Sequence, residues 1–268
     1  MIDYHIHTAR CHHATGTPQE YIAEARLKGL TEIGFADHFP LDLLNIIPSS
    51  PVSMSAEELT AYLEEIRELA EKNKDITIRL GLEVDYIPGR TEETADSFLS
   101  LPVDYLIGSL HFLGSWDFTH PAEKSTYLEK DLHELYENYF ADMGKLCRSG
   151  LFDIVGHIDV IKKFGFLPQI HLDQLWLKTA KELKENDLCL EINTAGLRAP
   201  VKEMYPAPGF LQYCFQENVP VAVGSDAHSP QEVGYKIDDA IALLRKVGYR
   251  EVATFIGRKR QMISLEGG

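Results

Sequence analysis

Histidine and carboxylate side chains recur along this sequence at one kind of position, the end of a short apolar run. The chain contains 11 His among 268 residues, a high number beside its 26 Lys and Arg. The residues at these positions are His5, His7, Asp37, His38, Glu83, His111, His157, Asp226 and His228. Neutral imidazole and carboxylate groups are ligands of first-row divalent metals. Their repeated placement favours a metal site built from several segments over isolated, solvent-exposed histidines.

The segments that must position these side chains alternate between apolar runs and amphipathic stretches. Seven apolar runs are predicted strands: residues 1–7, 33–36, 76–84, 103–110, 152–156, 188–192 and 219–224. Strands that alternate with helices indicate a parallel sheet covered by helices. Because the chain has no glycine-rich dinucleotide turn, a closed or nearly closed barrel of seven strands is favoured over an open doubly wound sheet.

The stretches between the runs carry helix signals. Thr17 with Glu20, and Ser55 with Glu58, have the spacing of capping boxes, which predicts a helix after each. Apolar periodicity supports the second of these helices over about 59–70. It predicts further helices at about 128–146, 172–184, 210–216 and 237–246. The last of these is expected to close the chain.

In a parallel barrel, the side chains at the C-terminal ends of the strands meet at one rim. Alternate residues of a strand point the same way, so His5 and His7 can both face the barrel axis. The set of ligand types exceeds the capacity of one tetrahedral ion, which implies at least two ions, with a carboxylate such as Glu83 able to bridge them. The sixth strand offers Asn193 instead of a metal ligand, and Arg198 follows it.

The composition limits the classes of protein that remain. Hydrophobic residues make up 44% and the net charge is -15, which suits one soluble domain over residues 1–268. Four Cys without paired spacing argue against a disulfide framework and fit a reducing cytoplasm. No run has the character of a signal peptide or the roughly 18–20 apolar residues of a membrane span. The acidic balance disfavours nucleic acid as a partner, and the oligomeric state cannot be read from the sequence.

Seven short motifs follow one another along nearly the whole chain. They are Asp3-Tyr4-His5-Ile6-His7-Thr8, Cys11-His12-His13-Ala14, Ala36-Asp37-His38-Phe39, Gly81-Leu82-Glu83, Gly108-Ser109-Leu110-His111, Gly156-His157 and Gly224-Ser225-Asp226-Ala227-His228. Together they resemble the polymerase and histidinol phosphatase (PHP) family of metal-dependent phosphoesterases. The segments 37–40 and 191–198 are similar to its monofunctional histidinol-phosphate phosphatase branch.

This resemblance implies an α/β fold with a distorted seven-stranded (β/α)7 barrel and three divalent metal ions, which could be Zn, Fe or Mn. The implied ligands, ion by ion, are His5, His7, Glu83 and Asp226; then Glu83, His111 and His157; then His13, His38 and His228. His13 is preferred to His12 because its distance from His7 matches the family spacing.

The resemblance also implies an activity, the hydrolysis of L-histidinol phosphate to L-histidinol and phosphate in histidine synthesis. The partner would be a small phosphate ester, and Glu83 and Asp226 would be the catalytic carboxylates. A water held between two metal ions is deprotonated near neutral pH and would be the nucleophile. Arg198 could clamp the phosphate with two N–H groups. Asp37 could either orient its neighbour His38 or protonate the leaving alkoxide.

Other functions fit parts of the same pattern. A PHP phosphoesterase for a different small monoester would share the metal cage and differ in its pocket loops. The complete ligand set disfavours a non-catalytic metal-binding protein, and the lack of an evident carboxylated lysine disfavours an amidohydrolase. The loop over residues 39–53 is either a lid or pocket wall, or a packed helical turn.

Overall fold

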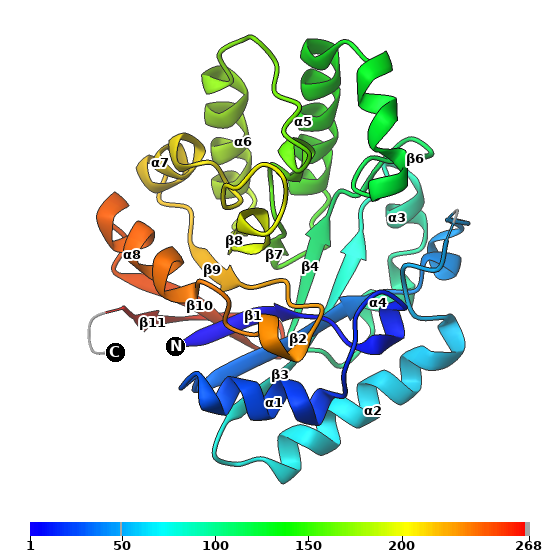
Figure 1. Ribbon diagram of the computed structural model, residues 1–268, viewed down its shortest axis with the longest axis vertical. Coiled ribbons are helices and arrows are strands. Elements are labelled where there is room, and N and C mark those ends of the chain that lie inside the picture. Colours follow the sequence, from blue (N-terminus) through cyan, green and yellow to red (C-terminus); the bar gives the residue numbers. More distant parts are fainter. Residues whose placement is uncertain (49, 266–268) are drawn as a thin grey trace.

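Seven parallel strands form the central sheet of the computed structural model, which describes residues 1–48 and 50–265 (Figure 1). In sheet order they are β1 (Ile2–Ile6), β2 (Glu32–His38), β3 (Thr77–Asp85), β4 (Tyr105–Ser109), β7 (Ile154–Val155), β8 (Cys189–Asn193) and β9 (Val221–Gly224). Every neighbouring pair is parallel, and the sheet order follows the chain. The seven apolar runs of the sequence are thus confirmed as the strands of one sheet.

The first and last strands meet, so that the sheet nearly closes into a barrel. The backbone N–H of His7 donates to the carbonyl of Ala227 over 3.0 Å, and the N–H of Ala227 donates to the carbonyl of His5 over 3.2 Å. Ile6 and Ala227 form a parallel bridge at the same place. The predicted barrel is confirmed, and its seam lies where β1 and the residues after β9 carry predicted ligands.

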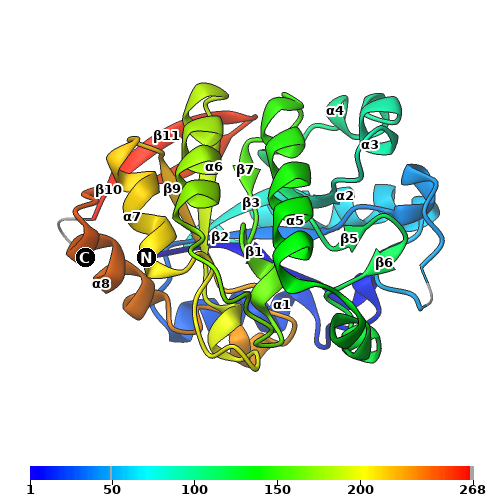
Figure 2. The ribbon, with the colours of Figure 1, turned by 90° about the horizontal axis from the view of Figure 1, so that it is seen from above.

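Helices cover the outside of the barrel. The α-helices are α1 (Pro18–Leu27), α2 (Ala56–Lys72), α3 (Arg90–Glu93), α4 (Asp96–Leu99), α5 (Leu132–Arg148), α6 (Asp173–Glu185), α7 (Pro208–Gln216) and α8 (Ile237–Val247). The 3₁₀ helices are η1 (Ala9–Cys11), η2 (Leu41–Leu44), η3 (Pro121–Glu129), η4 (Val160–Lys162), η5 (Ala195–Leu197) and η6 (Pro230–Glu232). Figure 2 shows α5 and α6 side by side on one flank. None of the described helices is long and apolar enough to cross a membrane.

The first two α-helices begin as the sequence predicts. At α1 the Thr17 side chain accepts the N–H of Glu20, and the Glu20 carboxylate accepts the N–H of Thr17 over 2.6 Å. At α2 the Glu58 carboxylate likewise accepts the backbone N–H of Ser55 over 2.9 Å, while the N–H of Glu58 donates to the backbone carbonyl of Ser55 over 3.1 Å. Both arrangements satisfy N–H groups that a helix start otherwise leaves without partners.

The long helix predicted over residues 128–146 begins later, at Leu132. The Asp131 carboxylate accepts the N–H of His133 over 2.8 Å and caps α5 there. The residues before this cap form η3, in which Leu128 is 76% exposed. The apolar character of Leu128 therefore does not mark a buried helix face.

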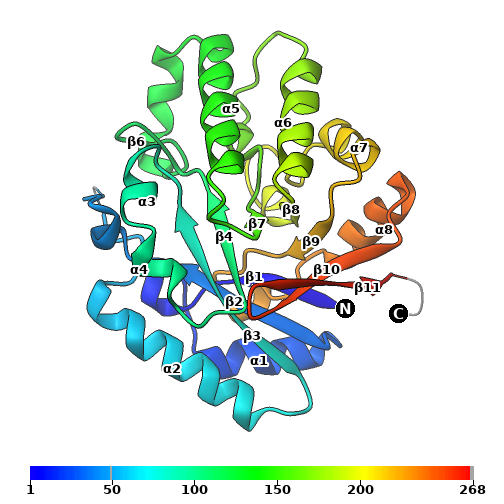
Figure 3. The same ribbon diagram turned by 180° about the vertical axis from the view of Figure 1, so that it is seen from behind.

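The prediction that a helix closes the chain was wrong. Two antiparallel strands, β10 (Glu251–Ile256) and β11 (Lys259–Ser264), form a hairpin after α8 (Figure 3). The ring of Phe255 packs 6.4 Å from Tyr4 and 6.2 Å from Tyr105, so β10 covers the end of the barrel opposite the predicted ligands. Nearly all of β11 is exposed, so its sequence lacks the alternation of apolar and polar residues that predicts a strand. A second hairpin, β5 (Phe112–Leu113) with β6 (Trp116–Asp117), was also not predicted.

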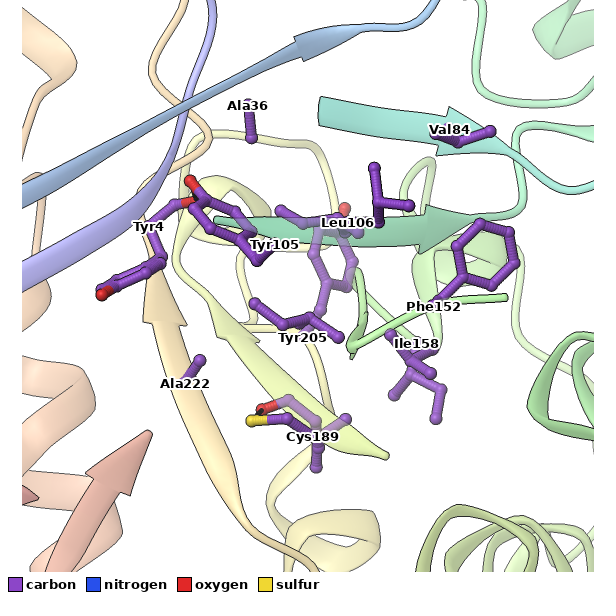
Figure 4. Packing of buried hydrophobic residues seen from close by; sticks show 14 of the residues in the cluster. Tyr4, Ala36, Val84, Tyr105, Leu106, Phe152, Ile158, Cys189, Tyr205 and Ala222 are labelled. Carbon is purple, nitrogen blue, oxygen red and sulfur yellow. Dashed lines mark hydrogen bonds between the residues drawn. The ribbon is translucent and has the colours of Figure 1, made fainter. Parts of the chain in front are cut away.

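Side chains fill the barrel interior (Figure 4). The ring of Tyr105 lies against Gly81, where an added Cβ would come within 2.4 Å of it. The Tyr105 hydroxyl donates to the carbonyl of Tyr4 over 2.7 Å. Phe152 packs against Gly108 in the same way, 2.5 Å from an added Cβ. This packed floor gives the ligand-bearing strand ends a rigid support.

Candidate active site

The predicted ligands meet at the C-terminal ends of the barrel strands, around a cavity of about 640 Å³. Those that line it are His13, His38, Glu83, His111, His157, Asp226 and His228. His5 and His7 lie deeper and are fully buried. Parallel strands end at the same side of the sheet, which explains why residues so distant in sequence converge here.

Glu83 stands between two groups of histidines and extends one carboxylate oxygen toward each. Its Oε2 lies 3.0 Å from Nδ1 of His38 and 3.4 Å from Nε2 of His5. Its Oε1 lies 3.0 Å from Nε2 of His157 and 3.6 Å from Nε2 of His111. A carboxylate placed in this way can bridge two metal ions, which is the role that the sequence suggests for it.

Asp226 completes one side of this arrangement. Its Oδ1 lies 3.2 Å from Nε2 of His7, which itself lies 3.6 Å from Oε2 of Glu83. Asp226 has a φ of 54°, a left-handed conformation that is uncommon outside glycine and enriched in Asp and Asn. Nη2 of Arg198 donates to the carbonyls of Ser225 and Asp226, each over 2.9 Å, and so holds this strained turn.

Several imidazole nitrogens of the cluster are buried without a hydrogen-bond partner. They are Nε2 of His5, both ring nitrogens of His7 and Nδ1 of His157. Elsewhere two ring nitrogens face each other, 3.2 Å apart for His111 and His157 and 2.9 Å apart for His13 and His228. Buried polar atoms without partners are costly, and converging imidazole nitrogens are satisfied by a shared cation. The donor set therefore fits divalent metal ions.

The charges of the cluster keep its carboxylates ionised and two of its histidines neutral. Burial favours the protonated form of Glu83, but His5 and His38 outweigh it and hold the pKa of Glu83 well below its usual range. Asp226 shows the same balance, with His5 again opposing burial, and its pKa is also well lowered. Burial lowers the pKa of His38 and of His228 well below the usual histidine value. Around His5, His7 and His111 the carboxylates outweigh burial and raise the pKa, to about 9 for His111, so these rings must release a proton to reach the neutral form that binds a metal.

Two buried carboxylates that the sequence analysis did not single out orient the ligand histidines. Glu191 of β8 lies 2.6 Å from Nδ1 of His5 and accepts the backbone N–H of His157 over 2.8 Å. Asp85 lies 2.8 Å from Nδ1 of His111. A carboxylate on one ring nitrogen fixes the tautomer, so that the other nitrogen can face a metal. An acidic residue inside an apolar run was the only sequence signal for either.

Asp37 faces His7 rather than its neighbour His38. Its Oδ1 lies 3.5 Å from Nδ1 of His7, and its carboxylate accepts the N–H groups of Thr8 and His38 over 3.0 Å and 2.8 Å. Asp37 is fully buried and is not one of the described residues that line the cavity. Of the two roles considered for it, these contacts favour orientation of a ligand, with His7 as that ligand, over protonation of a leaving group.

The three histidines implied for a third ion do not form one compact group. Ring centroids lie 4.6 Å apart for His13 and His228, 5.5 Å for His13 and His38, and 6.5 Å for His38 and His228. Their nitrogens instead belong to two overlapping groups, each with ligand atoms within 4.8 Å of one another. One group joins His13 and His228 with Cys11, and the other joins His38 and His228 with His7. Cys11 stands in the motif of residues 11–14, but its type and position predicted no role for it.

Arg198, predicted to clamp the substrate, is largely engaged by the protein. Besides the carbonyls described above, it contacts Glu232 through Nε over 3.1 Å and lies 5.0 Å from the centre of the Tyr235 ring. Its Nη1 is buried without a partner. The Nη1 amino group is thus left without a partner, but Arg198 is not among the described residues that line the cavity, and its substrate contact remains a prediction.

The four histidines without a predicted role divide into two kinds. His12, His133 and His171 are exposed to solvent. His120 lines the cavity, and its Nε2 lies 3.3 Å from the hydroxyl of Ser50. The exposed three are expected to be solvated, whereas His120 belongs to the pocket wall.

The cavity wall beyond the histidines carries a cation and an anion. Nζ of Lys163 donates to the carbonyl of Thr119 over 2.9 Å. Oδ1 of Asp117 accepts the N–H of Thr119 over 3.0 Å, its hydroxyl over 2.9 Å, and the N–H of His120 over 3.0 Å. All three bonds use the same oxygen, so Oδ2 of Asp117 is left for another partner.

The segment over residues 39–53 combines both roles considered for it. Leu41 and Leu44 of η2 are buried, as a packed helical turn requires. Further along, Pro51 and Val52 line the cavity as part of its wall.

Comparison with known proteins places these features in a family. The PHP domain family matches residues 3–195. A protein named probable histidinol-phosphatase from Deinococcus radiodurans is 41% identical over 264 residues, which cover 97% of this chain and 98% of that protein. The histidinol-phosphatase of Bacillus subtilis is 30% identical, over 87% of this chain and 95% of its own.

A solved structure is also similar along the whole chain. It is the crystal structure of histidinol phosphate phosphatase from Lactococcus lactis in complex with zinc, L-histidinol and phosphate. The TM-score is 0.84 at 25% identity, and the match covers 97% of this chain and 98% of that chain.

Proposed function

The chain belongs to the PHP domain family, and we propose that it hydrolyses L-histidinol phosphate to L-histidinol and phosphate in histidine biosynthesis. One observation carries the proposal: Glu83 lies between His5 and His38 on one side and His157 on the other, as a bridging ligand must. The similarity to histidinol-phosphatases over nearly the full length supports the same reaction. The chain is accordingly a phosphatase with a small-molecule substrate.

We assign three divalent ions to the strand ends. Their proposed ligands are His5, His7, Glu83 and Asp226 for the first, Glu83, His111 and His157 for the second, and His13, His38 and His228 for the third. Zinc is the ion in the Lactococcus structure, and the same donor types also suit Fe and Mn. When bound, such ions lower the pKa of a coordinated water toward 7 and neutralise phosphoryl oxygens.

The protein's own residues prepare this chemistry before substrate arrives. The low pKa values of Glu83 and Asp226 keep both carboxylates charged, so neither needs to lose a proton when it binds a cation. Glu191 and Asp85 hold the rings of His5 and His111 in fixed orientation. A preorganised polar site of this kind stabilises charge that develops during the reaction without reorganising.

The cavity has complementary contacts for a charged amino-alcohol ester. Lys163 places an ammonium group at the wall near Asp226 and Glu83, where a phosphate would be bound. Nη1 of Arg198 is a second candidate donor, although it is buried behind the residues that line the cavity. Asp117, with Oδ2 free of the three bonds to Oδ1, suits the ammonium group of the alcohol. The metal cage alone does not choose among esters, so another small phosphate monoester is the alternative substrate.

A panel of phosphate monoesters tests the proposal. kcat/KM would be measured for L-histidinol phosphate, phosphotyrosine, a nucleoside monophosphate and p-nitrophenyl phosphate on one metal-loaded sample. We expect L-histidinol phosphate to exceed the others by orders of magnitude, because its phosphate and its ammonium group can engage the two ends of the pocket at the same time. Similar values for all four esters would contradict the assignment of substrate and leave a general phosphatase.

A further inference from the structure

Cys11 is fully buried at the end of η1, beside the site proposed for the third ion. Its Sγ and one ring nitrogen from each of His13 and His228 all lie within 4.8 Å of one another. The ring of His38, which the family pattern implies for this ion, does not belong to that group. In this structure, the sulfur of Cys11 and the nitrogens of His13 and His228 form one group of donor atoms.

A second group places the same sulfur beside donors that the protein does not satisfy. Cys11, His7 and Asp37 also have ligand atoms within 4.8 Å of one another. His7 is fully buried, and neither of its ring nitrogens makes a hydrogen bond of good geometry, although Oδ1 of Asp37 and Oδ1 of Asp226 lie 3.5 Å and 3.2 Å from them. Such unsatisfied buried nitrogens next to a thiol point to a cation as their common partner.

The local backbone explains how Cys11 and His13 reach the same place. His12 adopts a left-handed conformation with a φ of 66°, and its exposed side chain separates the buried Cys11 from His13, which lines the cavity. The carbonyl of Cys11 lies 2.7 Å from Nδ1 of His13 and fixes that ring. Nε2 of His13 is then the nitrogen left for a metal, and it lies 2.9 Å from Nε2 of His228.

We propose that Cys11 is an additional ligand of the third ion, through Sγ, beside the His13, His38 and His228 proposed above. This inference rests on the proposed metal-dependent activity. When the metal–sulfur bond forms, the thiol S–H bond breaks and its proton leaves to solvent, with no change in oxidation state. A thiolate is a soft ligand, so this site favours zinc over manganese, in contrast to the two sites that offer only nitrogen and oxygen.

Cobalt(II) substitution tests this assignment independently of activity. A cobalt-loaded wild-type protein is expected to show a thiolate-to-cobalt charge-transfer band in the near ultraviolet. Cys11→Ala should lose that band and retain the visible bands of the other ions. Cys214→Ala is the matched control, because Cys214 is equally buried, in α7, and belongs to none of the potential ligand groups among the described residues. It should keep the near-ultraviolet band.

Zinc and manganese binding give a second measurement. Cys11→Ala should weaken zinc at one site by at least about tenfold and change manganese affinity less. Bound cobalt without the near-ultraviolet band, or a band that survives Cys11→Ala, overturns the thiolate ligand and leaves the phosphatase proposal standing. A wild-type protein that binds no divalent ion overturns both. If Cys11→Ala does not fold, zinc-edge X-ray absorption of the wild type still decides, because a sulfur ligand lies about 2.3 Å from zinc.

Discussion

Two of the proposed ligand histidines differ from the solvent-exposed histidines of this chain because a buried carboxylate contacts one of their ring nitrogens. Glu191 backs His5 and Asp85 backs His111, each at hydrogen-bond distance. His133, by contrast, is exposed on α5. The strand-end spacing was enough to propose the ligands, because the period of a strand dictates direction. The backing carboxylates could not be predicted, because their partners come from other strands.

Replacement of a ligand should separate activity from folding. His157→Ala removes a nitrogen 3.0 Å from Glu83, and we expect turnover to fall by about a thousandfold or more because one proposed ion loses its site. Circular dichroism should show an intact fold. His133→Ala, a substitution of the same kind on the surface, should leave turnover unchanged. Turnover of His157→Ala within tenfold of wild type would exclude His157 as a ligand.

Asp117 is expected to recognise the alcohol part of the substrate. Asp117→Asn removes the negative charge but keeps the shape, so kcat/KM for L-histidinol phosphate should fall by about tenfold or more, the equivalent of ~1.4 kcal/mol. The value for p-nitrophenyl phosphate, which carries no ammonium group, should not change. Equal losses on both esters would show that Asp117 supports the pocket rather than the amine.

Arg198 has one unpartnered amino group, Nη1, and a second, Nη2, that holds the turn of Asp226. If the free group contacts phosphate, Arg198→Ala raises KM by about tenfold, with a smaller effect on kcat. Arg198→Lys should not restore the wild-type KM, because an ammonium group cannot reproduce the fork of a guanidinium. A lowered kcat at unchanged KM would refute the phosphate contact and assign Arg198 to positioning Asp226.

The strands that carry the proposed ligands could be predicted from the sequence, whereas the hairpin that covers the opposite end of the barrel could not. Each barrel strand is an apolar run with a polar end, a pattern that tertiary packing reinforces. The hairpin of β10 and β11 has one buried strand and one exposed strand, and no sequence pattern indicates that the two strands pair. Similarly, Asp131 moves the start of α5 past Leu128 because a local cap outweighs a single apolar residue.

The barrel floor should be sensitive to a single methyl group. Gly81→Ala would place a Cβ about 2.4 Å from the Tyr105 ring, and we expect a loss of at least ~1–3 kcal/mol in the free energy of unfolding. Tyr105→Leu removes the clashing ring and should also destabilise the protein alone. The double variant should lose less than the sum of the two, as a denaturation series would show. Additive losses would contradict this contact.

The whole molecule is acidic, and the histidines and carboxylates at the ends of its strands form a cage that suits cations. The net charge of -15 disfavours polyanionic partners such as nucleic acid, which remains a prediction. It does not exclude a small phosphate ester, because ions bound at the strand ends set the local charge. Seven of the 11 His that stand out in the composition are proposed ligands of this cage.

Removal of metal should lower the stability of the folded chain. Metal at about 100 times its Kd stabilises the native state by ~2.7 kcal/mol, so a chelator should lower Tm by about 5–10 °C. The loss should be smaller in Glu83→Gln, whose bridging carboxylate is gone, and unchanged in His133→Ala. A Tm that does not respond to chelator would contradict a cage that binds metal tightly.

We propose that the protein hydrolyses L-histidinol phosphate with metal ions held at the strand ends. The most direct test measures metal content and phosphate release from L-histidinol phosphate on the same sample, after chelation and after stepwise return of zinc. We predict that turnover is lost on chelation and returns as the metal content rises through two to three ions per chain. Fewer than two ions per chain, or turnover that does not depend on them, would contradict the account.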